Sequence, residues 1–148
     1  MELVKLIIHS MNVSDLNKIK DTLEENFNNF WNYEIFRNEL ENNNSSYLVA
    51  EYDGEIVCYG GIKIILDEAE LMNIVTKVNM RNMGFAKKVL NELITVASEH
   101  GCVQINLEVN EHNESAIHLY ESFGFKQVGL RKKYYDDIDN AILMTLKI

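Results

Sequence analysis

Four cations and one glycine near the middle of this acidic chain could hold an anion. The 148-residue sequence has a formal net charge of −9, yet residues 71–91 contain no Asp or Glu. The same window holds Lys77, Arg81, Lys87 and Lys88 around Gly84. An anion there would meet several positive charges and no competing carboxylate, so the window predicts an anion-binding site.

The position of Gly84 suits a phosphate in particular. Apolar residues recur every three or four positions from Phe85 to Ala97, which predicts a helix that begins just after the glycine. The first turn of a helix presents unpaired backbone N–H groups and a partial positive charge, and a glycine without a Cβ lets a phosphate approach them. Neither a Walker A ending nor a G-x-G-x-x-G pattern is present. The charges fit equally well a solvated basic helix start in which Gly84 only ends the preceding strand.

A carboxylate that could act as a general base follows in the next predicted strand. Polar and apolar residues alternate from Gln104 to Asn110, so Glu108 shares one face with the polar residues and not with the apolar ones. Glu108 falls near the carboxyl end of this strand, where open α/β sheets place their ligands. From the strand pattern alone, a solvated glutamate at a strand end is the better interpretation.

The chain is predicted to have an α/β fold (mixed α+β), and this fold positions the residues described above. Strands are expected at residues 2–9, 46–52, 55–66, 71–76, 103–109, 125–133 and 141–147. Helices are expected at residues 14–25 with Ser14 as N-cap, after the N-cap Asn32, from Phe85 to a stop at His100-Gly101, and at residues 113–122 with Asn113 as N-cap. The order β-α-α-β-β-β-α-β-α-β-β predicts a central mixed sheet whose fourth and fifth strands run parallel through a right-handed crossover.

Turn residues predict three irregular points in the sheet. Asp53-Gly54 between two apolar runs is typical of a tight β-hairpin. Gly60-Gly61 inside the following strand indicates a β-bulge, and residues 67–70 are expected to form a polar turn. The chain has no proline, so glycine and short polar side chains must make every break.

Composition predicts a single globular domain over residues 1–148. The chain is 47% hydrophobic and 25% charged, has no apolar run long enough to span a membrane, and starts without the basic segment of a signal peptide. We therefore expect a cytoplasmic protein, with Cys58 and Cys102 as buried reduced thiols. The acidic balance argues against direct nucleic-acid binding and favours a basic partner. His112 and His118 lack the spacing of metal ligands, and no metal is expected.

The motif Arg81-Asn-Met-Gly84-Phe-Ala86 resembles the R/Q-x-x-G-x-G/A motif of the GNAT superfamily of N-acetyltransferases. Segments 67–74, 107–110, 113–125 and 131–135 resemble, in addition, the bacterial ribosomal-protein-alanine N-acetyltransferases of that superfamily. The resemblance is strong from about residue 67 to the end and looser before it. Three features depart from the pattern: Lys77-Val78 replaces an Asp-Pro, Ala86 replaces a glycine, and no proline precedes Trp31.

The resemblance implies the GNAT fold and acetyl-CoA as cosubstrate. Ile74, Val75 and Thr76 would offer backbone groups to the acetyl-pantetheine arm, which would lie along the strand like an added strand. Asn113 would hydrogen-bond the pantetheine. The diphosphate would be held by the motif and its immediate neighbours, namely Arg81, Asn82, Met83, Gly84, Phe85, Ala86 and Lys87.

The resemblance also assigns roles to catalytic and acceptor residues. Glu108 would be the general base and Tyr120 the general acid, although a tyrosine at that helix spacing is by itself more typical of a core residue. Trp31, Tyr134 and Tyr135 would line the acceptor groove, with strand packing as the alternative for the two tyrosines.

The function implied is direct acetyl transfer to a protein N-terminal α-amine of the ribosomal-protein-alanine type. An α-amine with a pKa of about 7.7–8.0 is roughly one-tenth neutral at pH 7, so a modest base suffices. The expected partner is a basic protein N-terminus, such as that of a small-subunit ribosomal protein, and the enzyme is expected to be a monomer or weak dimer without membrane contact. Two alternatives remain open: a GNAT enzyme that acetylates a small-molecule amine, and a CoA-binding module without turnover.

Overall fold

The computed structural model describes residues 5–27, 32–135 and 138–148. The strands are β1 (Leu6–Ser10), β2 (Ser45–Tyr52), β3 (Glu55–Ile65), β4 (Glu68–Thr76), β5 (Gln104–Asn110), β6 (Lys126–Tyr135) and β7 (Asp139–Lys147). The helices are α1 (Val13–Ile19), α2 (Leu23–Phe27), α3 (Tyr33–Glu41), α4 (Phe85–Glu99) and α5 (Glu114–Ser122). The predicted order of elements is confirmed, with the first helix divided into α1 and α2 by a 3₁₀ turn at Lys20–Thr22.

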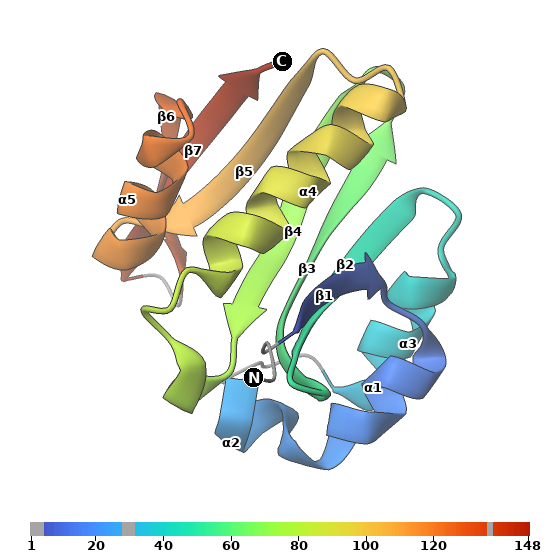
Figure 1. The fold of residues 1–148 in the computed structure, drawn as a ribbon. Coiled ribbons are helices and arrows are strands. Elements are labelled where there is room, and N and C mark those ends of the chain that lie inside the picture. Colours follow the sequence, from blue (N-terminus) through green and yellow to red (C-terminus); the bar gives the residue numbers. More distant parts are fainter. Residues whose placement is uncertain (1–4, 28–31, 136–137) are drawn as a thin grey trace.

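The described strands form one seven-stranded sheet in the order β1-β2-β3-β4-β5-β7-β6. All neighbours are antiparallel except β4 and β5, whose predicted parallel pairing is confirmed. Figure 1 shows α4 and α5 on one face of the sheet and α1, α2 and α3 on the other. The fold is the mixed α/β arrangement expected from the sequence.

Each face of the sheet has its own apolar core. On the α4 side, Val89, Leu90 and Leu93 pack against alternate residues of the central strands. On the other side, the ring centroids of Phe36 and Tyr59 lie 5.1 Å apart, and the Phe27 ring is tilted against that of Tyr59 with centroids 5.4 Å apart. The two cores fill the space between the sheet and its helices, so the functional groups must lie at strand ends, in gaps between strands or on parts of the sheet that no helix covers.

The first helix begins earlier than predicted, because Asn12 and not Ser14 is its N-cap. The Asn12 side chain accepts a hydrogen bond from the Asp15 N–H at 2.9 Å, and the Asp15 carboxylate accepts one from the Asn12 N–H at 2.9 Å. This reciprocal capping box satisfies two helix-end donors, which a cap at Ser14 would not do. The predicted caps Asn32 and Asn113 are confirmed by side-chain bonds to the N–H groups of Ile35 and Ala116.

The turn predictions were right at two places and wrong at one. Asp53 and Gly54 both have positive φ, as a two-residue hairpin turn requires. The pairing of β3 with β4 shifts between Gly61 and Ile62, which confirms a bulge there. The predicted turn at residues 67–70 is wrong, since β4 already begins at Glu68 and the chain reverses through Leu66, whose φ is 58°.

The parallel strands β4 and β5 stay paired over only three residues each. Glu68, Ala69 and Glu70 pair with Gln104, Ile105 and Asn106, and no later pair exists between the two strands. After that point β4 remains paired with β3 alone, and β5 with β7 alone. The strands therefore separate at Glu70 and leave an opening in the middle of the sheet.

Both cysteines are free and buried, as predicted. Among the described residues, no helix is both long and apolar enough to cross a membrane.

Candidate active site

The turn before α4 has the geometry of an anion site. Gly84 is the N-cap with φ +84°, and Asn82 also has positive φ, so the chain turns sharply into the helix. No side chain of the described residues caps this helix start, which leaves the first N–H groups of α4 to bind something else. A Cβ on Gly84 would meet no atom within 4 Å, so the space before the helix is open.

The cations of the window divide into one paired residue and three others. Lys77 makes an ion pair with Glu55 and is therefore partly neutralised. Arg81, Lys87 and Lys88 are exposed, and the described part of the chain offers them no ion pair. These three cations and the helix N-terminus can together attract a polyanion.

The edge of β4 beside the opening offers free backbone groups. Ile74, Val75 and Thr76 pair with Gly60, Tyr59 and Cys58 of β3 on one side. On the other side β5 has already separated, so among the described residues this edge has no strand partner. An extended molecule can lie there and complete the hydrogen bonding of β4.

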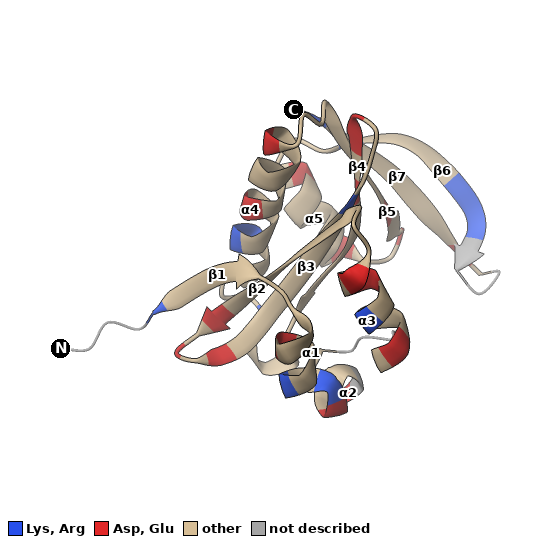
Figure 2. Cartoon of the chain, turned by 90° about the vertical axis from the view of Figure 1, so that its right-hand side faces the viewer, with Lys and Arg blue, Asp and Glu red and all other residues tan. Residues whose placement is uncertain are grey.

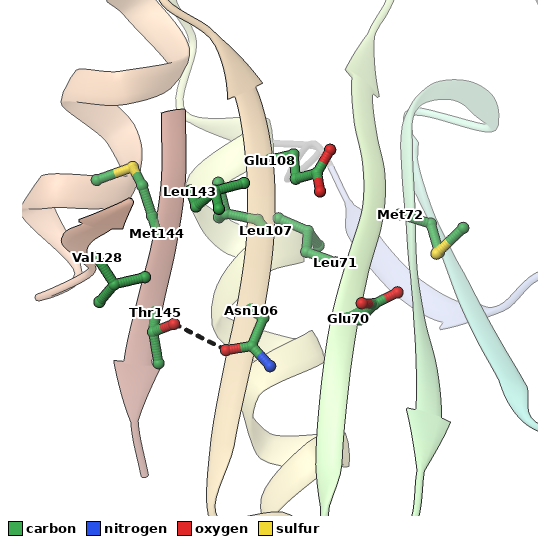
Figure 3. A pocket seen from close by; sticks show the side chains of 10 residues that line it. All are labelled: Glu70, Leu71, Met72, Asn106, Leu107, Glu108, Val128, Leu143, Met144 and Thr145. Atoms are coloured by element: carbon green, nitrogen blue, oxygen red, sulfur yellow. Dashed lines mark hydrogen bonds between the residues drawn. The ribbon is translucent and has the colours of Figure 1, made fainter. Parts of the chain in front are cut away.

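Glu108 lines a pocket at the opening, on the sheet face opposite α4. The pocket has a volume of about 730 Å³ and is lined by Glu70, Leu71, Met72, Asn106, Leu107, Glu108, Val128, Leu143, Met144 and Thr145. Figure 3 shows the lining residues on neighbouring strands of the sheet, with Glu70 on β4 and Glu108 on β5. The predicted alternation is confirmed, since Ile105, Leu107 and Val109 are buried and Glu108 is exposed.

A cation on the edge strand contacts the proposed base. The Arg131 guanidinium lies 3.1 Å from the Glu108 carboxylate, with 52% and 33% of the two side chains exposed. Deeper in the pocket, the Asn106 amide oxygen accepts a hydrogen bond from the Thr145 hydroxyl at 2.7 Å. The carboxylate thus lies beside a cation and within reach of solvent.

Tyr120 lies on the other face of the sheet. It is buried at 9% exposure, belongs to the core on the α4 side, and its ring lies 5.7 Å from that of Phe125. Glu108 faces the opposite side of β5. The structure therefore places the two residues on opposite faces of the sheet.

A profile of the acetyltransferase (GNAT) family matches residues 16–125, most of the chain. The chain belongs to the GNAT acetyltransferase family. It is accordingly an acetyltransferase, and acetyl-CoA is the acetyl donor that enzymes of this family use.

Within the GNAT family, the chain is similar to several ribosomal-protein-alanine N-acetyltransferases. A Bacillus subtilis (strain 168) protein, provisionally named a [ribosomal protein bS18]-alanine N-acetyltransferase, is 31% identical over 146 residues and covers 97% of each chain. The [ribosomal protein bS18]-alanine N-acetyltransferase of Haemophilus ducreyi is 35% identical over 113 residues, 72% of this chain and 78% of that one. The crystal structure of the Escherichia coli ribosomal-protein-S18-alanine N-acetyltransferase superposes with a TM-score of 0.88 at 27% identity, covering 97% of this chain and 94% of that one.

Not every residue expected at the GNAT site can be placed. Trp31 lies outside the described residues. Tyr134 and Tyr135 belong to β6, but only their backbone is described. The expected roles of these three residues in acceptor binding stay predictions.

A group of three side chains of the types that can ligate metals lies away from the GNAT site. His9, Asp15 and Glu51 have ligand atoms within 4.8 Å of one another. Asp15 already accepts the capping-box hydrogen bond, and Glu51 contacts His9 at 3.4 Å and Lys18 at 3.8 Å. The group comes from β1, α1 and β2, and β3 separates these two strands from β4, the first strand that lines the pocket.

Sequence reasoning gave no role to Glu70 or to the side chain of Arg131. Glu70 was expected in a turn. The strand register shows that it instead pairs with Asn106, at the last position where β4 and β5 are paired. Arg131 reaches Glu108 across β7, and no spacing in the sequence indicates a contact between strands that are not neighbours. The run of cations that begins at Arg131 was the one feature of the sequence that could have indicated a partner for Glu108 on this strand.

Proposed function

We propose that this GNAT enzyme transfers acetyl from acetyl-CoA directly to the N-terminal α-amine of a ribosomal protein of the bS18 type. The observation that carries the proposal is the opening between β4 and β5. It has the anion-binding turn on one side and the Glu108 pocket on the other. The names of the relatives from Bacillus subtilis, Haemophilus ducreyi and Escherichia coli support the acceptor.

Acetyl-CoA fits the residues present on the α4 side. The turn from Arg81 to Lys87 would hold the diphosphate through backbone N–H groups and exposed cations. The free edge at Ile74, Val75 and Thr76 would hold the pantetheine arm. Asn113 uses its amide oxygen to cap α5, so its NH₂ group remains to donate to a pantetheine carbonyl.

Glu108 and Tyr120 would divide the proton transfers between the two faces of the sheet. Acetyl-CoA supplies the acyl group, and the acceptor nitrogen forms a new C–N bond as the C–S bond breaks. Glu108 accepts the proton that the amine gives up, directly or through one water molecule. Tyr120, on the opposite face of the sheet, would provide a proton to the departing sulfur.

The charge of the enzyme suits a basic protein acceptor. Figure 2 shows Asp and Glu on α1, α2, α3 and the β2–β3 turn, and also on α4 and β4, while residues 71–91 contain neither. With a net charge of −9, the enzyme would attract a cationic ribosomal protein over several ångströms and so raise the rate of encounter. We place this reaction in the cytoplasm, within one domain that spans residues 1–148.

The direct test uses the enzyme, acetyl-CoA and a mixture of the host's ribosomal proteins. Mass spectrometry of intact proteins and of their N-terminal peptides then locates the new acetyl group. We expect one small-subunit protein to gain a single acetyl on its N-terminal α-amine. Acetylation of free polyamines or aminoglycosides, without any protein acceptor, would overturn the proposal in favour of a small-molecule enzyme. CoA binding without thiol release from any acceptor would favour a binding module.

A further inference from the structure

The pocket around Glu108 is lined by two carboxylates and by no Lys or Arg. Glu70 comes from β4 and Glu108 from β5, and the remaining lining residues are neutral. The side-chain view shows the two carboxylates on opposite sides of the opening (Figure 3). A pocket with this lining favours a cationic occupant over a neutral or an anionic one.

The two carboxylates differ in whether the protein neutralises them. Arg131 lies 3.1 Å from Glu108 and offsets its charge. Glu70 is exposed, and the described residues provide it with no ion pair. On β3, the residue paired with Glu70 is Lys63, which likewise has no ion pair among the described residues. Glu70 is therefore the carboxylate that remains available for a charge brought by a ligand.

The strand register sets the distance between the two carboxylates. Glu70 is paired with Asn106, and Glu108 lies two residues further along β5 on the same face. Two residues of strand span about 7 Å, and one strand spacing adds about 5 Å at right angles, so the two Cα atoms are about 9 Å apart. An extended peptide covers about 7 Å in two residues. An arginine or lysine side chain on such a peptide can span the rest of the distance between Glu108 and Glu70.

We propose that Glu70 is a specificity-determining residue that binds a basic side chain of the acceptor while its terminal amine lies at Glu108. The basic side chain belongs to one of the two residues that follow the acetylated residue. This inference rests on the proposed transfer to a protein N-terminus and adds a sequence preference to it. Glu70 acts through binding and takes no part in the proton transfers.

Glu68 provides a matched control on the same strand. It is exposed like Glu70 and two residues away, so it lies on the same face of β4, but it does not line the pocket. Glu68→Gln and Glu70→Gln therefore make the same change in net charge, and only the second changes the pocket. Both positions are at the surface, and neither substitution removes core packing.

The test compares two acceptor peptides that start with alanine and carry either arginine or the neutral isostere citrulline at the second and third residues. We expect the unaltered enzyme to favour the arginine peptide in kcat/KM by about three- to tenfold, mainly through KM, as one partly exposed ion pair allows. Glu70→Gln should reduce this ratio to less than about twofold, whereas Glu68→Gln should keep it. The preference should also weaken as salt is raised.

Three outcomes would overturn the role of Glu70: no preference in the unaltered enzyme, an unchanged ratio in Glu70→Gln, or an equal loss in Glu68→Gln. Failure of the proposed function has a different result, because neither peptide would then be acetylated by any of the three proteins.

Discussion

The guanidinium of Arg131 lies 3.1 Å from the carboxylate of Glu108, and the contact crosses a whole strand. Arg131 on β6 is paired with Ala141 of β7, and Glu108 on β5 is paired with Leu143 of β7. The ion pair thus connects the edge strand β6 to the proposed base in the middle of the sheet. Because both side chains are partly exposed, the pair adds only about 0–1 kcal/mol to stability, so its main effect is to orient the carboxylate.

Glu108→Gln should lower kcat/KM for a peptide acceptor by about 10²- to 10³-fold at pH 7, because the amide cannot accept a proton. Affinity for CoA should stay within about twofold, since the turn at Gly84 leads into α4, and α4 covers the other face of the sheet. At pH 9 most α-amines are already neutral, so the deficit should shrink. Thiol release at both pH values and calorimetry with CoA check these points. An equal deficit at the two pH values would exclude the role of Glu108 as base.

Arg131→Gln should lower kcat by about five- to twentyfold because Glu108 loses its fixed orientation. The melting temperature should fall by less than about 4 °C, as expected for a partly exposed ion pair. In the Glu108→Gln background, Arg131→Gln should have little further effect on kcat, because the arginine acts through the carboxylate. Additive losses in the double variant would show that Arg131 acts independently of Glu108.

Tyr120→Phe should bind CoA normally and turn over about 10²-fold more slowly, because it lacks only the proposed proton donor. The ring would still pack 5.7 Å from that of Phe125, so we expect a loss of stability of about 1 kcal/mol from the hydroxyl. Single-turnover rates and urea unfolding separate the two effects. Normal turnover would leave Tyr120 as a core residue without a role in the chemistry.

Gly84→Ala should weaken CoA binding by tenfold or more. Gly84 has φ +84°, and an added Cβ would meet only open space, so the change acts through backbone conformation. A residue with a Cβ pays about 1–2 kcal/mol in the left-handed region, which would shift the turn and its N–H groups.

Gly101→Ala is the matched control at the other end of α4. Gly101 has φ +79° and also faces open space, so its substitution should destabilise the fold by a similar amount. It lies far from the helix N-terminus and should leave the CoA dissociation constant unchanged. Equal loss of CoA affinity in the two variants would point to a general effect of instability and not to a phosphate site at Gly84.

Features determined by neighbouring residues were predictable from the sequence. Asp53-Gly54 forms the expected hairpin because both positions need positive φ, and these residue types tolerate it. The face of β5 that carries Glu108 follows from simple alternation of residues. Gly84 at the start of α4 was found from charge and helix periodicity together.

Features that depend on distant pairing could not be predicted in the same way. Both Asn12 and Ser14 are good caps, and only the reciprocal bond from Asp15 decides for Asn12. The separation of β4 from β5 depends on where pairing stops, which no local pattern records. The contact of Arg131 with Glu108 depends on the β6–β7 register, which is irregular near Gln127 and Arg131.

The buried thiol of Cys58 should make the fold less stable in mild alkali. Burial raises the pKa of this thiol to about 11, whereas an unfolded cysteine titrates near 8.5. Between those values the unfolded chain loses a proton that the folded chain keeps, so the free energy of unfolding falls as pH rises. We expect Cys58 to account for about 1–2 kcal/mol of this loss between pH 8 and pH 10.

Cys58→Ala should be less stable at pH 7, because it leaves a small cavity, but its stability should decline less with pH. Urea unfolding from pH 7 to pH 10 tests this: the two curves should converge, and parallel curves would mean that the folded protein does not shield the Cys58 thiol from ionisation.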